Sequence, residues 1–401
     1  MSAENHTAKK APVYLDYNAT TPCDEMVLKE MLPFFCDHFG NAASISSQHG
    51  LKAHLAVERS REQIASLLHA NSNEIIFTSG ASESNNLGLR GVYAACQHQG
   101  NHIISSSIEH SATLATLKDL ERTGARVSLI KPKKDGSFNL EALKTLITPE
   151  TILISVMYAN NELGVINPID EIAAIAKQHN ILFMCDATQA VGKIPINLKE
   201  CPIDILTCSA HKVYGPKGIG ALYLRRKKGK KVVDIRPQIT GGNSEQGMRG
   251  GTLNVPGIVG FGKAAELAFH KLGLEMKQYQ YQRDKLEKEL MQVGNIQVNG
   301  GACRRLPHVS NISFKNVDGS KLLNILKKSL SISTGSACSS SNLTPSHVLI
   351  ELGLSEELAQ ATIRFSLGRQ TTDEDIEFTI TEIHKALRVL SPAFAEVTPT
   401  P

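Results

Sequence analysis

The sequence lacks any hydrophobic run long enough to cross a bilayer, and residues 1–11 contain neither an apolar signal core nor an arginine-rich amphipathic pattern. Its eight cysteines are scattered and include no Cys-x-x-Cys pair. That spacing argues against a disulfide framework and indicates a reducing compartment. No internal repeat and no low-complexity linker interrupts the chain. These absences argue against membrane, secreted and repeat proteins and predict a cytoplasmic one.

The sequence also lacks a large excess of either positive or negative charge. The formal net charge is +4, and the composition, 41% hydrophobic and 20% charged, is that of an ordinary globular protein. The basic cluster at 225–231 is more typical of a solvated turn than of a nucleic-acid surface. We therefore expect neither nucleic acid nor membrane as a partner.

The length of 401 residues exceeds one small core and predicts two unequal domains, or one large unit with an appendage. Short runs rich in Ile, Val and Leu alternate with helical patterns over the first two thirds of the chain. This alternation predicts an α/β fold with a mostly parallel sheet covered on both faces. The strands are expected at 74–78, 102–106, 126–130, 151–157, 181–186 and 203–208.

The last third has a different pattern. Residues 254–269 and 273–293 are expected to form one long, broken helix that leads away from the first domain. After it, a small α+β domain is expected, with strands at 309–314 and 331–334 and helices at 320–328 and 372–390.

Two polar side chains follow neighbouring predicted strands. Lys212 stands in a rigid turn after one strand, among Ser209, His211 and Tyr214. A partly desolvated lysine there has a lowered pKa and can condense with an aldehyde, although a lone lysine in such a loop is usually only a surface residue. Asp186 ends the preceding strand, where open α/β sheets place their ligands. A lysine for the aldehyde and an aspartate for the pyridine nitrogen are the pair that pyridoxal phosphate requires.

A third strand end carries an anion-binding pattern. The strand at 74–78 is followed by Ser79-Gly80-Ala81-Ser82 and then by a helix, so free N–H groups and the helix dipole would face a phosphate. A helix-capping turn that binds no ligand would have a similar sequence pattern. No Walker-type motif offers a second phosphate site in this sequence. Cys201, Cys208 and His211 do not have a usual zinc spacing, and we expect no metal site.

At this point a family resemblance is clear. The segments Asp186-Ala187-Thr188-Gln189 and 209–220 resemble the signatures of cysteine desulfurases of the housekeeping iron–sulfur type, among the fold-type I pyridoxal-phosphate enzymes. The likeness runs from Tyr14 to about Ser391. It implies a large cofactor-binding domain at 16–265, and a small domain formed by 1–15 and 266–401 that carries a mobile cysteine loop.

The resemblance also assigns roles to residues. It implies that Lys212, Cys338 and His110 are catalytic, that Asn161 and Arg364 bind the substrate, and that the following residues bind pyridoxal 5'-phosphate: Ala81, Ser82, Asn161, Asp186, Gln189, Ser209, His211, Lys212 and Thr252. Ser82 stands where the family more often has threonine, and both supply a hydroxyl. Thr252 would reach the cofactor phosphate of a second subunit, which implies a homodimer.

Cys338 lies among small polar residues, from Ser333 to Ser341, that cannot pack it as a core cysteine. The resemblance makes it the nucleophile that takes sulfur from L-cysteine, leaving L-alanine, and holds the sulfur as a persulfide. Arg364 stands among apolar neighbours, where an unpaired guanidinium would be costly and a clamp on the substrate carboxylate would satisfy it.

Two alternatives remain: a selenocysteine lyase or other β-eliminating enzyme on the same fold, and a non-catalytic scaffold. The intact set of Asp186, Lys212, Cys338 and Arg364 argues against the scaffold. Relatives carry a longer C-terminal tail that docks the iron–sulfur scaffold protein, whereas this chain stops at Pro401. The resemblance implies a sulfur-acceptor protein, such as an iron–sulfur scaffold, as a partner. Because the tail is shorter here, the identity of that acceptor is left open.

Overall fold

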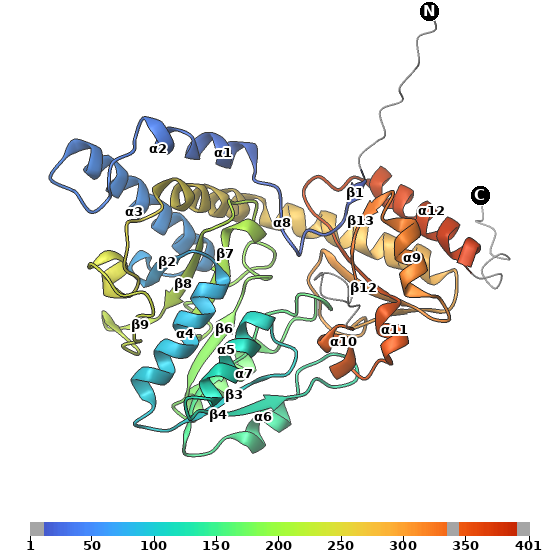
Figure 1. The fold of residues 1–401 in the computed structure, drawn as a ribbon, viewed down its shortest axis with the longest axis horizontal. Helices are drawn as coiled ribbons and strands as arrows, with labels where there is room; N and C mark the ends of the chain where they lie inside the picture. Colours follow the sequence, from blue (N-terminus) through green and yellow to red (C-terminus); the bar gives the residue numbers. More distant parts are fainter. Residues whose placement is uncertain (1–11, 335–344, 391–401) are drawn as a thin grey trace, which may run out of the picture.

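A seven-stranded sheet forms the centre of the larger lobe in the computed structural model, which describes residues 12–334 and 345–390 (Figure 1). Its strands are β2 (Ile75–Thr78), β3 (His102–Ser106), β4 (Arg126–Ile130), β5 (Thr151–Ser155), β6 (Leu182–Asp186), β7 (Ile205–Ser209) and β8 (Gly220–Leu224), in the order β2-β8-β7-β6-β5-β3-β4. The pairs from β4 to β7 are parallel, and β8 runs antiparallel to β2 and β7. The expected mostly parallel sheet is confirmed, whereas β8 was not expected.

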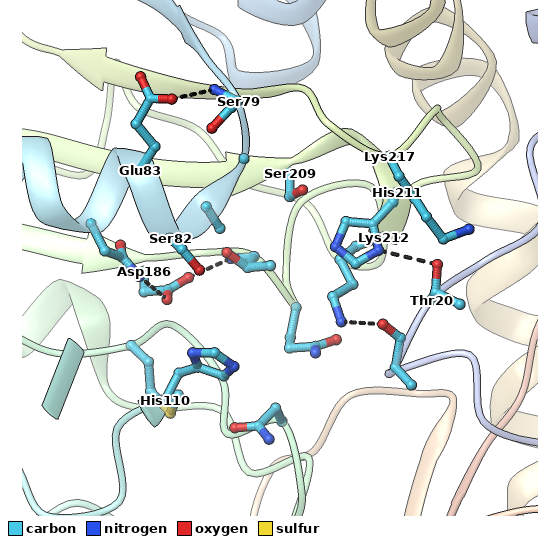
Figure 2. Close-up of a pocket in the computed structure, with 18 of the residues that line it drawn as sticks. Thr20, Ser79, Ser82, Glu83, His110, Asp186, Ser209, His211, Lys212 and Lys217 are labelled. Carbon is cyan, nitrogen blue, oxygen red and sulfur yellow. Dashed lines mark hydrogen bonds between the residues drawn. The ribbon is translucent and has the colours of Figure 1, made fainter. Parts of the chain in front are cut away.

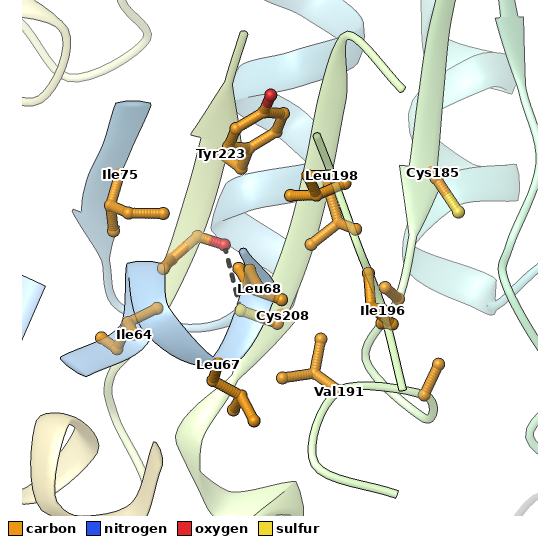
Figure 3. Close-up of a cluster of buried hydrophobic side chains, with 14 of the residues drawn as sticks. Ile64, Leu67, Leu68, Ile75, Cys185, Val191, Ile196, Leu198, Cys208 and Tyr223 are labelled. Carbon is orange, nitrogen blue, oxygen red and sulfur yellow. Dashed lines mark hydrogen bonds between the residues drawn. The ribbon is translucent and has the colours of Figure 1, made fainter. Parts of the chain in front are cut away.

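Helices cover both faces of this sheet because its strands are apolar on both sides. Ile75 and Phe77 pack with α3 (Gln48–Leu68), α7 (Ile169–Gln178) and the first half of α8 (Val255–Met291). Ile76, the residue between them, packs on the other face with α4 (Ala81–Cys96) and α5 (Ser111–Glu121). Figure 3 shows part of the first layer, where Ile64 and Leu68 of α3 lie near Ile75 and Cys208.

Helix α8 joins the two lobes without interruption (Figure 1). Phe261 and its neighbours belong to the core of the larger lobe, and Leu286 and Leu290 belong to the core of the smaller one. The expected break near Gly273 is therefore wrong. A Cβ added at Gly273 would have no atom within 4 Å, so this exposed glycine only lowers the local helix propensity. The packing of both ends of α8 outweighs that loss of propensity.

The smaller lobe contains a four-stranded antiparallel sheet in the order β11-β12-β15-β14, formed by β11 (Ile296–Val298), β12 (Val309–Phe314), β15 (Thr362–Ser366) and β14 (Ser333–Thr334). Its helices are α9 (Gly319–Leu326), α10 (His347–Glu351), α11 (Glu356–Gln360) and α12 (Asp373–Leu390). The N-terminal strand β1 (Val13–Tyr14) pairs in parallel with β13 (Leu330–Ser331), and Val13 and Leu15 enter this core. The strand expected at 331–334 is thus divided between two sheets.

The larger lobe contains several further short elements. They are α1 (Glu25–Met31), α2 (Pro33–Cys36), α6 (Leu140–Leu146), the hairpin of β9 (Arg226–Lys227) and β10 (Lys230–Lys231), and the short 3₁₀ turns η1 (Ser72–Glu74), η2 (Ala210–Lys212) and η3 (Ser244–Gly247). Within residues 12–334 and 345–390, no helix has both the length and the apolar character that a membrane span requires.

Gly164 lies where the two lobes meet, and we predict that it does not tolerate a side chain. Its φ is 74°, and a methyl group there would lie 2.8 Å from the Cβ of Val309. Gly164→Ala should lower the free energy of unfolding in urea by about 2–3 kcal/mol, through backbone strain and overpacking together. Gly353→Ala is the matched control: its φ is 91°, and no described atom lies within 4 Å. It should lose only about 1 kcal/mol. Equal losses would show that the contact with Val309 is relieved.

Candidate active site

A cavity of about 550 Å³, the main cavity of the candidate site, lies where the strands of the large sheet end. The turn after β2 contributes Gly80 to it. The last residue of β6 contributes Asp186, the turn after β7 contributes Lys212, and the loop after β3 contributes His110 (Figure 2). Parallel strands place their carboxyl ends along one edge of the sheet, so residues far apart in sequence meet there.

Most of the residues expected to form the site line this cavity: Ala81, Ser82, His110, Asn161, Asp186, Gln189, Ser209, His211 and Lys212. Thr252 does not line it, and instead lines a second cavity of about 820 Å³ with Arg61 and Glu245. Arg364 does not line the main cavity, but it donates to the carbonyl of Asn161, which does. Cys338 lies outside the described residues.

Asp186 is held in one orientation by a chain of hydrogen bonds. The side-chain amide of Asn85 donates to its Oδ2 at 2.7 Å, and the N–H of Thr188 donates to its Oδ1 at 3.0 Å. Asn85 in turn accepts a 2.6 Å hydrogen bond from the hydroxyl of Thr207. Sequence reasoning missed Asn85. The only signal was its position one turn into the helix that follows the glycine turn.

The phosphate cradle expected after β2 has the features that an anion needs. Gly80 is the N-cap residue of α4 and provides no side-chain cap, so no such cap blocks the N-terminal N–H groups of the helix. A Cβ at Gly80 would lie 3.9 Å from the hydroxyl oxygen of Ser209, which lies beside this turn. With Asp186 at the other side of the cavity, these residues fit pyridoxal phosphate: hydroxyls and N–H groups for the phosphate, and a carboxylate for the ring nitrogen.

Lys212 lies in the 3₁₀ turn η2, directly after β7. Its amine donates hydrogen bonds to the carbonyl of Asn18 and, at 2.8 Å, to that of Ala19. Burial, with a smaller contribution from nearby Arg364, lowers the pKa of Lys212 to about 8. The amine is therefore easier to deprotonate than a surface lysine, as condensation with an aldehyde requires.

Both histidines of the cavity favour their neutral forms. Burial, reinforced by the neighbouring Lys212, lowers the pKa of His211 to about 4. Burial also lowers the pKa of His110. The N–H of Ala112 donates to Nδ1 of His110 at 3.1 Å, so the neutral ring carries its proton on Nε2. His110 can thus donate a hydrogen bond through Nε2 within the cavity (Figure 2).

Tyr214 fixes the turn that carries Lys212. Its φ of 66° is left-handed, and its ring contacts two basic side chains, with Lys193 Nζ 4.6 Å and Arg369 Cζ 3.9 Å from the ring centroid. Its hydroxyl accepts from the N–H of Arg369 at 2.8 Å, and its own N–H donates to the hydroxyl of Thr21 at 2.8 Å. Sequence reasoning noticed Tyr214 but missed its contacts with Lys193 and Arg369.

The expected surroundings of Arg364 were wrong. Ile363 and Phe365 face the core of the smaller lobe, but strand alternation turns Arg364 to the other face. There it donates to the carboxylate of Asp16 at 2.6 Å and to the carbonyl of Asn161 at 3.0 Å, so the guanidinium is already paired. Its Nε has no hydrogen-bond partner in the described part of the chain.

No group of three or more His, Cys, Asp and Glu side chains within residues 12–334 and 345–390 is placed to hold a metal ion. The seven described cysteines are free thiols.

Comparison with known proteins adds independent findings. The family model for class-V aminotransferases matches residues 13–378. The chain is 45% identical to the cysteine desulfurase IscS of Anaeromyxobacter dehalogenans, over 97% of this chain and 96% of that one. It is 48% identical to the cysteine desulfurase IscS of Buchnera aphidicola, over 96% and 95% of the two chains.

Solved structures agree with these relatives. A NifS-like protein superimposes with a TM-score of 0.87 at 38% identity, over 94% of this chain and 100% of that one. A structure described as SspA in complex with cysteine superimposes with a TM-score of 0.78 at 38% identity, over 88% and 98% of the two chains.

Lys193 generates a prediction on pH and stability. It is 4% exposed and has no hydrogen-bond partner in the described structure, and burial lowers its pKa from 10.5 to about 7. Between these pH values the unfolded chain binds more protons than the folded chain, so stability rises with pH. Relative to Lys193→Met, the wild type should gain up to about 1.4 kcal/mol per pH unit above pH 7.

Urea unfolding at pH 7, 8 and 9 measures this gain, and Lys199→Met, at an exposed lysine, serves as the control. A difference between wild type and Lys193→Met that stays constant with pH would contradict the prediction.

Proposed function

This chain belongs to the class-V aminotransferase family, and on that premise we propose that it transfers the sulfur of L-cysteine to Cys338, through the residues assembled at the main cavity. The enzyme depends on pyridoxal phosphate and is a cysteine desulfurase, as its relatives at 45–48% identity are. The observation that carries the assignment is Lys212 opposite Asp186 in one cavity at the strand ends, in a chain that is aligned with those relatives over nearly its full length.

We propose that Ala81, Ser82, Ser209 and His211 hold the cofactor phosphate, and that Asp186 and Gln189 hold its ring. When bound, pyridoxal phosphate supplies an electron sink that stabilises negative charge at the α-carbon of the substrate. The chain of hydrogen bonds from Thr207 through Asn85 keeps Asp186 oriented for this task.

The remaining steps belong to side chains of the protein. Lys212, with its lowered pKa, takes the proton from the α-carbon of L-cysteine and later returns a proton as L-alanine forms. The thiolate of Cys338 attacks the substrate sulfur, so that a sulfur–sulfur bond forms while the carbon–sulfur bond breaks. His110, neutral with its proton on Nε2, is placed to donate a hydrogen bond or proton in the cavity.

The role of Cys338 is supported by the described residues on both sides of 335–344. Ser333 pairs with Arg364 in the sheet, and the hydroxyl of Ser346 donates to the carboxylate of Glu162, next to Asn161. The described residues on both sides of 335–344 therefore lie beside residues proposed to bind the substrate.

A homodimer is the proposed assembly. Thr252 lies away from Lys212, at the second cavity, as a residue that serves a partner's cofactor would. Large apolar side chains are also exposed on α1, α2 and the segment between α2 and α3: Met26, Leu28, Phe35, Phe39 and Ile45. Such a surface is typical of one covered by another subunit. The two cores further support domains at 16–265 and at 1–15 with 266–401, joined within α8.

We also propose a sulfur acceptor and a cellular compartment for this enzyme. A persulfide-accepting protein, such as an iron–sulfur scaffold, is the expected partner. The free thiols of the described cysteines fit a reducing compartment such as the cytoplasm.

Cys338→Ser tests the function. The variant keeps the side-chain shape but replaces the thiol by a hydroxyl that is not ionised near neutral pH. It should retain its pyridoxal phosphate absorbance and still change that absorbance on addition of L-cysteine. It should form almost no alanine or sulfide under dithiothreitol and carry no added sulfur by intact mass.

Cys303→Ser, which removes a half-buried thiol away from the main cavity, should behave as wild type. If Cys338→Ser releases alanine and sulfide at the wild-type rate, the enzyme is a simple β-eliminase. If neither variant responds to L-cysteine although wild type does, both have lost substrate binding.

Arg364 is proposed to bind the α-carboxylate of the substrate, sharing the guanidinium with Asp16. Arg364→Ala should raise the KM for L-cysteine roughly 10- to 100-fold, the loss of a hydrogen bond between charged groups. It should leave the absorbance of the resting enzyme unchanged, because the described residues around the cofactor are intact. Arg364→Lys keeps the charge but not the bidentate geometry, and its KM should lie between those of the wild type and Arg364→Ala. A wild-type KM in Arg364→Ala would exclude the role.

A further inference from the structure

Asn18 is a buried residue on which several parts of the site converge, and no role has been given to it above. Its side chain is 2% exposed. The side-chain amide donates to the carbonyl of Asn161 at 2.9 Å, and the main-chain N–H donates to the hydroxyl of Ser366 at 2.9 Å. Its main-chain carbonyl accepts from both Lys212 and, at 3.1 Å, Gln189. One residue thus connects the N-terminal segment, the large lobe and strand β15.

His308, which directly precedes β12, fixes the orientation of this side chain. The Nε2 of His308 lies 2.9 Å from Oδ1 of Asn18, and the ring is 1% exposed. Because the other end of the Asn18 amide donates to Asn161, Oδ1 is an acceptor and His308 Nε2 is the donor. Burial lowers the pKa of His308 well below its usual value, which leaves the neutral ring with its proton on Nε2.

Two carbonyls hold the amine of Lys212 in this arrangement, those of Asn18 and Ala19. We propose that Asn18 is a positioning residue: its carbonyl and that of Ala19 form a resting site for the free amine of Lys212, and His308 keeps this site in place. The proposal rests on the proposed function in one respect, that Lys212 is the residue whose amine is freed and bound again in each cycle.

The resting site has a clear physical consequence. In the proposed reaction the amine of Lys212 would be free when it acts on the α-carbon of the substrate. An unrestrained lysine would sample many rotamers, and ordering it again for each step would cost side-chain conformational entropy. Two carbonyl acceptors restrict the amine to one region beside the cavity. They also favour its charged form, against the opposing effects of burial and Arg364, while Asp16 and Asp186 act in the same direction as the carbonyls.

The test measures the reactivity of the Lys212 amine in the full-length chain after removal of pyridoxal phosphate. Folding is verified by recovery of the absorbance when the cofactor is added back. Acetic anhydride acylates only the neutral amine, and peptide mass spectrometry reports the labelling of Lys212 as a function of pH. Asn18→Ala releases the carbonyl from its fixed position, so the pKa of Lys212 should fall below about 8, and labelling at pH 7 should rise about three- to tenfold.

Three further variants separate positioning from general loss of structure. Asn299→Ala removes an equally buried asparagine, 1% exposed, whose amide donates to Asn311 and Ser313 in the small sheet. It should lower Tm but leave the labelling of Lys212 unchanged. His308→Leu should reproduce the effect of Asn18→Ala. His308→Gln, which retains a donor near the position of Nε2, should restore wild-type labelling.

Unchanged labelling in both Asn18→Ala and His308→Leu overturns the proposal, and so does an equal rise in Asn299→Ala. Should Asn18→Ala fail to fold, the two His308 variants decide alone. Failure of the function is a separate result: borohydride reduction of the loaded enzyme that places the pyridoxyl group on another lysine would refute the role of Lys212, whatever its labelling.

Discussion

The backbone conformation of Tyr214 is the constraint on which the position of Lys212 depends. A tyrosine with a φ of 66° is strained, and it persists only where its surroundings require it. Here Lys193 and Arg369 both contact the ring, and the hydroxyl of Thr21 accepts a hydrogen bond from the N–H. Because Val213 alone separates Tyr214 from Lys212, fixing the tyrosine fixes the turn, and a flexible side chain starts from a rigid base.

The contacts around Tyr214 also join parts of the chain that are far apart in sequence. Arg369 follows β15 of the smaller lobe, and it also pairs with Glu275 of α8 at 2.6 Å and with Asp24 at 3.2 Å. The hydroxyl of Tyr279, on α8, lies 3.3 Å from that of Tyr214. The turn of the large lobe is therefore held by the helix that joins the lobes and by the smaller lobe itself. The unbroken course of α8 (Figure 1) is what keeps these contacts in register.

The sequence predicted the parts of the site that depend on local pattern. Asp186, Lys212 and the turn at Ser79 to Ser82 each follow a strand, and strand ends converge by the geometry of a parallel sheet. It did not predict partners that depend on tertiary contacts. Asp16 pairs with Arg364, and Asn18 meets Lys212 and His308, only because the N-terminal segment joins the smaller lobe beside β15. β8 escaped prediction because no α-helix separates it from β7, so the alternation of strands and helices that located the other strands does not reveal it.

Burial sets the protonation of the cavity more than any single pair of charges does. It lowers the pKa of Lys212, His211 and His110, and raises that of Glu109, which lies beside His110 and accepts from the N–H of Met157. Each of these groups is thereby shifted toward its neutral form. A lysine whose pKa is lowered to about 8, beside neutral histidines and an oriented Asp186, suits a reaction that moves one proton on and off a carbon, because it can both give and take a proton near neutral pH. The apolar core beneath the strand ends, part of which Figure 3 shows, is thus a cause of the chemistry as well as of the fold.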